Sequence, residues 1–224
     1  VYDLLKQKRN EINLNRNEEF YIARINYSPN GKLAAQVLNR HQDVLDFYYV
    51  DQSGNASIAF TEKDKAYVDV TDDLTFLEDG SFLWTSEKDN WRHIYHYDAN
   101  GKEKKQITNG NWDVTSYYGY DSDNKRIFYQ STEDGSINRG IYSISLKGKK
   151  KMKLSNQIGS NSASFSSDFS YFINTYSSAT TPPMYTLHTS KKGERVREIK
   201  NNNALLDKLD NYYFAQKEFS TINI

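Results

Sequence analysis

A serine hydrolase of the Gly-x-Ser-x-Gly type presents its nucleophile on a sharp strand-to-helix turn, with an aspartate and a histidine later in the chain. The nearest segment in this sequence is Gly159-Ser160-Asn161-Ser162, which lacks the second glycine. We expect this segment to lie in a loop between structural units. Cysteine is absent, so thiol catalysis and disulfides are excluded. We therefore predict no catalytic residue in this chain.

The four histidines have poor spacing for a metal site. His93 and His96 are three residues apart in a predicted strand, so their side chains should point to opposite faces. His41 and His188 have no cysteine, aspartate or glutamate at ligand spacing. We expect hydrogen-bonded structural histidines, and we predict neither a metal nor a cofactor.

Glu18 and Glu19 are adjacent carboxylates, and two carboxylates near one ammonium group could bind the amino terminus of a peptide. They are the only candidate substrate contacts that we single out. The alternative is a solvated charged turn in which neither residue contacts a ligand.

Tryptophans and a basic run offer weaker signals. Trp84, Trp91 and Trp112 could form a carbohydrate platform, but their places in or beside predicted strands favour packing between structural units. Arg92 would then donate hydrogen bonds between those units. The basic run at residues 147–151 (KGKKK) is expected to be a solvated hairpin tip.

The elements that position these residues follow a fourfold repeat. A glycine recurs at intervals of 47, 47 and 45 residues, at Gly54, Gly101, Gly148 and Gly193. Six positions later stands a large apolar residue, in turn Phe60, Ile107, Leu154 and Ile199. This period is that of a four-stranded propeller blade, although HEAT repeats overlap it.

Composition favours strands over the helices of HEAT repeats. The chain has 18 Tyr, 11 Phe and only 3 Pro, and its short apolar runs are separated by turn signals. The first turn of each unit is predicted at Asn30-Gly31, Asp79-Gly80, Asp123-Asn124 and Asp168-Phe169. We expect the first three to be two-residue hairpins, since Asn, Asp and Gly tolerate positive φ. In the third strands, both faces should be buried.

We therefore predict an all-β fold, a partial β-propeller of about four blades with four antiparallel strands each. Residues 1–19 would be the closing strand of a preceding blade and a connection, and blades would span 20–61, 65–108, 113–155 and 161–200. Residues 201–224 would hold a short helix, capped by an asparagine of the run 201–203, and a strand leading to another domain.

Bulk properties exclude some classes of partner. The 29 basic residues are balanced by 29 acidic ones, so no basic field would attract nucleic acid. No apolar run approaches the roughly 20 residues that a membrane helix needs. The chain starts at Val1 without a methionine, and we expect a processed or excised piece.

Several motifs resemble the N-terminal propeller of the dipeptidyl peptidase IV family. They are residues 86–101 (SEKDNWRHIYHYDANG), 106–114 (QITNGNWDV), 38–42 (LNRHQ), 182–188 (PPMYTLH) and 203–205 (NAL). The last three match bacterial relatives in particular. The resemblance covers nearly the whole chain.

The resemblance implies an eight-bladed propeller coupled to a C-terminal α/β-hydrolase domain. Such enzymes release dipeptides, or in close relatives tripeptides, from peptides with proline near the N-terminus. This chain would be the later half of the propeller, inactive alone, and would help to gate and position substrates. The family's amine-binding glutamate pair lies nearer the start of the propeller than Glu18 and Glu19 do. Bacterial relatives imply a periplasmic location.

The rival hypothesis is a stand-alone propeller that binds a protein or glycan without catalysis, and an envelope propeller of the TolB kind is a third. A half propeller exposes blade faces that normally pack. We therefore expect the isolated chain to form a homodimer or to be marginally stable.

Overall fold

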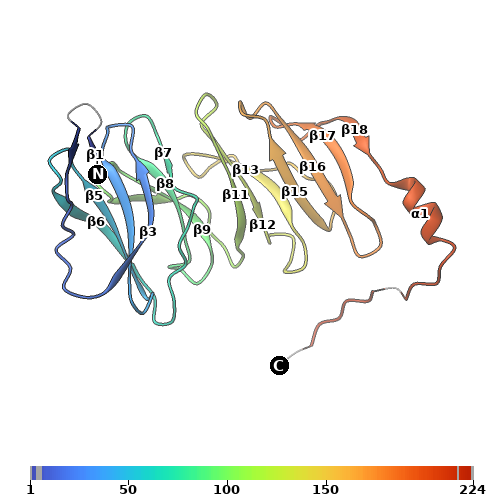
Figure 1. Cartoon of the computed structure of the whole chain (residues 1–224). Coiled ribbons are helices and arrows are strands. Elements are labelled where there is room, and N and C mark those ends of the chain that lie inside the picture. The colour runs from blue at the N-terminus through green and yellow to red at the C-terminus, as the bar shows by residue number, and fades with distance from the viewer. Residues whose placement is uncertain (1, 4–6, 216, 223–224) are drawn as a thin grey trace. The chain divides into compact units, whose positions relative to one another are not determined.

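The computed structural model describes residues 2–3, 7–215 and 217–222 (Figure 1). These residues form four antiparallel four-stranded sheets, a two-stranded ribbon and one helix. The all-β prediction is confirmed, and the four sheets are consistent with part of a β-propeller. The chain divides into two compact units, Val1–Asn109 and Gly110–Ile224, each with two of the four sheets.

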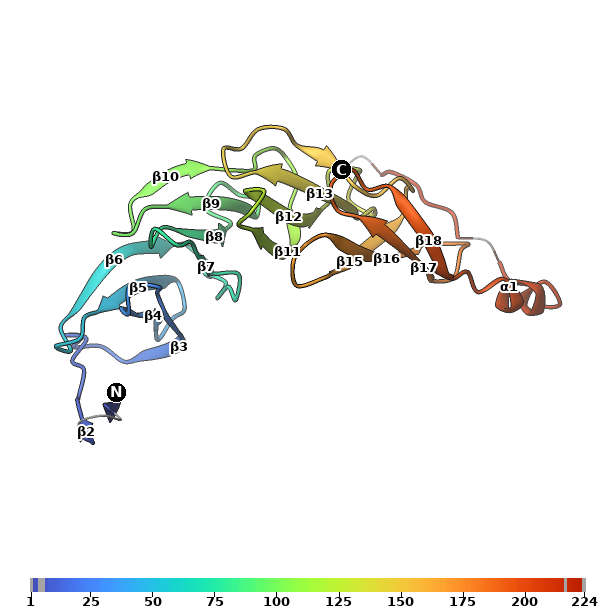
Figure 2. The same cartoon turned by 90° about the horizontal axis from the view of Figure 1, so that it is seen from above.

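Strands within each sheet follow chain order (Figure 2). The first unit holds a sheet of β3 (Phe20–Tyr27), β4 (Leu33–Asn39), β5 (Val44–Val50) and β6 (Ala56–Lys63), and a sheet of β7 (Thr75–Phe76), β8 (Phe82–Ser86), β9 (His93–Tyr97) and β10 (Glu103–Gln106). The second unit holds a sheet of β11 (Val114–Asp121), β12 (Arg126–Ser131), β13 (Gly140–Ser145) and β14 (Met152–Lys153), and a sheet of β15 (Ser160–Phe165), β16 (Tyr171–Ser177), β17 (Met184–Thr189) and β18 (Arg195–Lys200).

Aromatic side chains form the core of the first unit. The Phe47 ring stacks on Phe60 and on Phe82, with centroids 5.0 and 5.3 Å apart, so the core joins the first and second sheets. Both faces of the third strands are buried in the first three sheets, as predicted: one face carries Tyr48, Tyr95 and Tyr142, and the other Phe47, Ile94 and Ile141. In the fourth sheet Thr186 is buried and Leu187 half-buried.

The predicted two-residue hairpins are wrong in length. The Gly31 N–H donates to the Ser28 carbonyl and the Ser28 N–H donates to the Lys32 carbonyl, both at 2.9 Å, which leaves a three-residue loop. A two-residue type I′ turn needs two positive φ angles, but in this loop Gly31 alone has one, at 73°. The turn ending at Gly80 has the same bonding pattern. In the third sheet, four residues at 122–125 join β11 to β12.

The fourth hairpin adopts the glycine conformation without a glycine. Phe169 has φ 54°, and its N–H donates to the Ser166 carbonyl at 3.0 Å. Its ring stacks on Phe128, with centroids 5.3 Å apart. A Cβ at Gly119 would lie 2.5 Å from this ring. Packing of the ring therefore offsets the cost of the left-handed backbone.

In each unit, one glutamine forms a hydrogen bond from the second strand of a sheet to the segment that leads into the next sheet. Gln36 Nε2 on β4 donates to the Thr71 carbonyl at 3.0 Å, and Gln130 Nε2 on β12 donates to the Asn161 carbonyl at 2.6 Å. The two glutamines stand 18 positions before the marker glycines of their repeats. A buried amide thus satisfies a carbonyl at or near the entry to the next sheet.

The chain ends differ from the sheets. Tyr2–Asp3 forms β1, which pairs antiparallel with β2 (Lys8–Arg9), while Val1 and Leu4 lie outside the described residues. The predicted helix is α1 (Asn203–Leu209). Asn202 precedes it without a side-chain cap bond, and Asn201 Oδ1 instead accepts from the Asn203 N–H at 3.1 Å. Among the described residues, no helix is long and apolar enough to cross a membrane.

Candidate functional site

A cavity of about 430 Å³ lies in the first unit, beside the segment that connects β6 to β7. We call this segment, residues 64–74, the arch. Residues of the arch, of the end of β6, and of β8 with the loop that follows it line the cavity. These elements lie together because the arch connects the last strand of the first sheet to the first strand of the second sheet.

Polar contacts anchor the C-terminal half of the arch. Thr71 accepts the Gln36 amide through its carbonyl, and its hydroxyl lies 2.7 Å from that of Thr85 on β8. Asp73 Oδ2 accepts from Arg92 Nη2 at 2.8 Å and from the Thr85 hydroxyl at 2.9 Å. The sequence predicts Arg92 as a donor between blades, and the structure shows it donating to the connecting segment.

Glu62 is an acid of the cavity wall that is held by a buried tryptophan. Its Oε1 accepts from Trp84 Nε1 at 3.0 Å, and Trp84 is fully buried. Burial raises the pKa of Glu62, against the lowering effects of its hydrogen bonds from Ser86 and Trp84. Perturbed titratable groups in cavities are candidates for function. The sequence predicts a packing role for Trp84 and contains no signal for Glu62.

Lys88 lines the cavity, and its ammonium group interacts with two carboxylates. Its Nζ forms an ion pair with Glu103 and lies 4.0 Å from the centroid of the Tyr95 ring. Its charge also acts on Glu62. One positive charge thus stands against the two negative charges of Glu62 and Glu103, so this group of three side chains keeps a net negative charge.

The structure places Glu18 and Glu19 outside this cavity, in the segment before β3. Glu18 Oε1 lies 2.7 Å from Arg16 Nη2, and Glu19 Oε2 lies 3.8 Å from Arg40 Nε. Their side chains are 63% and 85% exposed. Each carboxylate faces a different arginine, and both line a second cavity of about 290 Å³ together with Phe20, Tyr21 and Arg40.

Three of the four histidines have structural partners. His93 Nδ1 lies 3.1 Å from the Thr108 hydroxyl, and His96 Nε2 lies 3.0 Å from that of Ser81. His188 contacts the Thr186 hydroxyl and the Gly193 carbonyl, at 2.8 and 2.9 Å. Within the described part of the chain, no three His, Cys, Asp or Glu side chains gather as a metal site would require.

The hydrolase-like segment lies in a strand, not in the expected loop. Ser160 and Ser162 belong to β15 and pair with Ser177 and Thr175 of β16. A nucleophile elbow needs a turn from a strand into a helix, and β15 continues instead into an antiparallel hairpin. Neither serine is therefore presented as a nucleophile.

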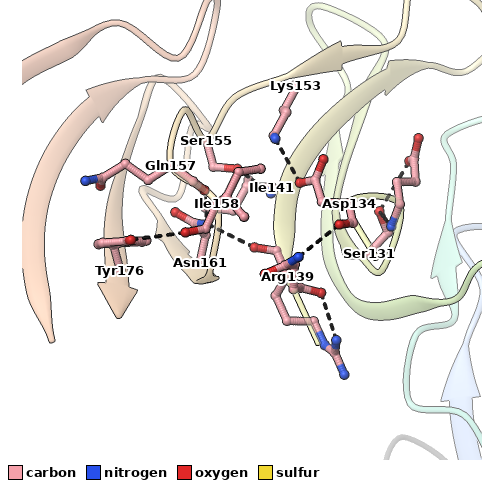
Figure 3. Close-up of polar contacts among 12 residues, drawn as sticks. Ser131, Asp134, Arg139, Ile141, Lys153, Ser155, Gln157, Ile158, Asn161 and Tyr176 are labelled. Carbon is pink, nitrogen blue, oxygen red and sulfur yellow. Dashed lines mark hydrogen bonds and ion pairs between the residues drawn. The ribbon is translucent and has the colours of Figure 1, made fainter. Parts of the chain in front are cut away.

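Asn161, between these serines, is a structural link in the second unit (Figure 3). Its Nδ2 donates to the carbonyls of Arg139 and Gln157, at 3.0 and 2.9 Å. Nearby, Lys153 Nζ forms an ion pair with Asp134 at 2.8 Å. These bonds hold the loop before β13 and the entry to β15 in place, which is a structural role.

The remaining signals of the sequence also belong to packing. Trp112 stacks on Tyr129, with centroids 6.2 Å apart. Lys151 is exposed, as predicted for the basic run, and its Nζ forms an ion pair with Glu133 and lies 5.6 Å from the centroid of the Trp112 ring. Its ammonium group is therefore both solvated and paired.

The chain is similar to solved peptidase structures. It superimposes on dipeptidyl peptidase 4 of Porphyromonas gingivalis with a TM-score of 0.90 and 39% identity, over 98% of this chain and 31% of that one. A putative dipeptidyl aminopeptidase IV from Bacteroides ovatus shares the fold, with a TM-score of 0.75 and 20% identity over 89% of this chain.

Fungal dipeptidyl peptidases are also similar to this chain in sequence. "Probable dipeptidyl peptidase 4" of Aspergillus flavus is 27% identical over 80% of this chain, and dipeptidyl peptidase 4 of Arthroderma otae is 26% identical over 88%. The chain spans about a quarter of the length of these relatives. The model of the dipeptidyl peptidase IV (DPP IV) N-terminal region matches residues 1–183. This chain therefore belongs to the family of dipeptidyl peptidase IV N-terminal regions.

Proposed function

We propose that this chain is a non-catalytic propeller segment of a serine exopeptidase that releases Xaa-Pro dipeptides, or tripeptides, from peptide N-termini. The observation that carries the proposal is the 39% identity to dipeptidyl peptidase 4 of P. gingivalis over 98% of the chain. Its partners are a C-terminal α/β-hydrolase domain of the same protein and peptides with proline near the N-terminus. Its location is the periplasm or cell envelope.

In this proposal the propeller gates and positions substrates. A wall of packed sheets limits entry to short or unfolded peptides and excludes water from the reacting groups. The strand position of Ser160 and Ser162 supports a non-catalytic role, since it offers no elbow for a nucleophile. The hydrolase domain would supply the triad.

The test compares the complete product of the encoding gene with this 224-residue chain. Gly-Pro and Ala-Ala-Pro chromogenic peptides are the substrates, and the preferred one separates dipeptide from tripeptide release. We expect the complete product to cleave and the 224-residue chain to be inactive. If neither cleaves, the proposal is overturned in favour of a binding propeller without catalysis.

A further inference from the structure

The cavity beside the arch has an excess of negative charge. Four acidic and three basic side chains line it. Two of the basic groups are already neutralised by acids outside the lining, since Lys88 pairs with Glu103 and Arg92 with Asp73. The arch acid Asp69 and its neighbours therefore favour a cation over an anion.

An apolar wall stands beside these charges. Val68 is 7% exposed, Val70 is partly buried, and the Tyr67 ring is 52% exposed on the same arch. Lysine and arginine side chains combine an aliphatic stem with a charged head, so they suit a wall of this kind. An exposed tyrosine ring also attracts a cation to its face.

Glu62 is held in a fixed position within this lining. The Trp84 indole that donates to its Oε1 packs edge-on against Phe47 and Phe60, with centroids 5.7 and 5.5 Å apart. The carboxylate is therefore oriented before any ligand arrives, which lowers the entropic cost of binding. Burial disfavours its charged form, and an incoming cation would relieve that cost.

We propose that the arch cavity binds a basic side chain, lysine or arginine, of a peptide, with Glu62 as its counter-ion. The inference rests on the proposed function in taking a peptide as the ligand. It adds a specificity-determining site that would favour peptides with a basic residue within reach of the arch.

The test is calorimetric titration of the full chain with acetyl-Ala-Lys-Ala-amide and with acetyl-Ala-norleucine-Ala-amide, which has a similar stem without the ammonium group. We expect the lysine peptide to bind about tenfold more tightly, the ratio that one charge-assisted contact typically supplies. E62Q should remove most of this preference. E78Q, in the exposed β7–β8 turn outside the lining, is the matched control and should keep it.

Equal binding of the two peptides, or equal behaviour of E62Q and E78Q, would overturn the inference. Glutamine can still accept the Trp84 N–H, and a thermal melt checks that E62Q is folded. Failure of the proposed function is distinguishable: the complete gene product then cleaves no Xaa-Pro peptide, while the lysine preference in binding persists. Cleavage of Xaa-Pro peptides without any preference for the lysine peptide in binding would overturn the cavity inference and leave the proposed function standing.

Discussion

At the scale of single residues, Glu62 makes the stability of the fold depend on pH. In the unfolded chain its carboxyl titrates near the ordinary value of 4.5, and burial in the fold raises this pKa. The folded state therefore binds a proton more tightly than the unfolded state. The resulting stabilisation is complete below pH 4.5 and is lost as the pH rises through the folded pKa.

We expect E62Q to be more stable than the parent chain at pH 7.5, because glutamine avoids the burial of a charge and keeps the Trp84 bond. The difference should shrink as the pH falls towards 4.5. Thermal melts from pH 4.5 to 8 measure it, with E78Q as the control. A parent chain more stable than E62Q at neutral pH would contradict the assignment.

Phe169 gives a second prediction at this scale. Alanine would lose the Phe128 stacking and keep the positive φ, whereas glycine loses the stacking but relieves the backbone. We expect F169A to lower the free energy of unfolding by about 2 kcal/mol, and F169G by about 1 kcal/mol less. The free energy of unfolding in urea measures both effects. A larger loss of stability in F169G than in F169A would show that the positive φ at this position carries no cost for packing of the ring to offset.

Among elements, the decisive contacts are those that join one sheet to the next. Each sheet forms from local hairpins, but the hydrogen bonds of Gln36 and Gln130 cross to the segment that enters the following sheet. Gln130 also accepts from Thr115 at 2.7 Å, whereas Gln36 Oε1 has no protein partner. Gln130 therefore uses both its amide nitrogen and its amide oxygen in hydrogen bonds within the protein, whereas Gln36 uses only its nitrogen.

Replacing these glutamines with leucine should therefore have unequal effects. We expect Q130L to cost about 2 kcal/mol and Q36L about 1 kcal/mol, since each leaves a carbonyl unpaired and Q130L also strands a hydroxyl. The free energy of unfolding in urea measures both, with Q52A in an exposed turn as the control. Equal losses would show that the additional Thr115 bond is worth nothing.

At the scale of the whole molecule, a surface of exposed apolar side chains lies on β3. Ile22 and Ile25 are 57% and 63% exposed, and both line a groove of about 200 Å³ with Phe20 and Leu14. Apolar surface of this kind, on an edge strand, favours association.

We expect the isolated chain to self-associate through this face, and I25K to shift it towards monomer, because a charged side chain blocks edge pairing. Sedimentation equilibrium measures both. I137K, at a loop residue that is 59% exposed, is the control. A monomeric parent chain would refute the expectation.

The sequence alone determined the repeat, the strand-rich fold and the two buried faces of the third strands in the first three sheets. These depend on local signals that recur along the chain: turn residues, apolar alternation and the marker glycines. It also led correctly to the family, because the motifs at residues 86–101 and 106–114 are contiguous in the chain.

Only the tertiary structure decided the arch cavity. Glu62, Trp84 and Lys88 lie on different segments, and their sequence neighbours give no sign of a buried acid. The length of the hairpins also escaped the sequence, since Asn-Gly suits both two- and three-residue loops, and hydrogen bonding with the flanking strands selects between them. Local pattern fixes which strands form, whereas burial and charge at the cavity depend on how distant segments pack.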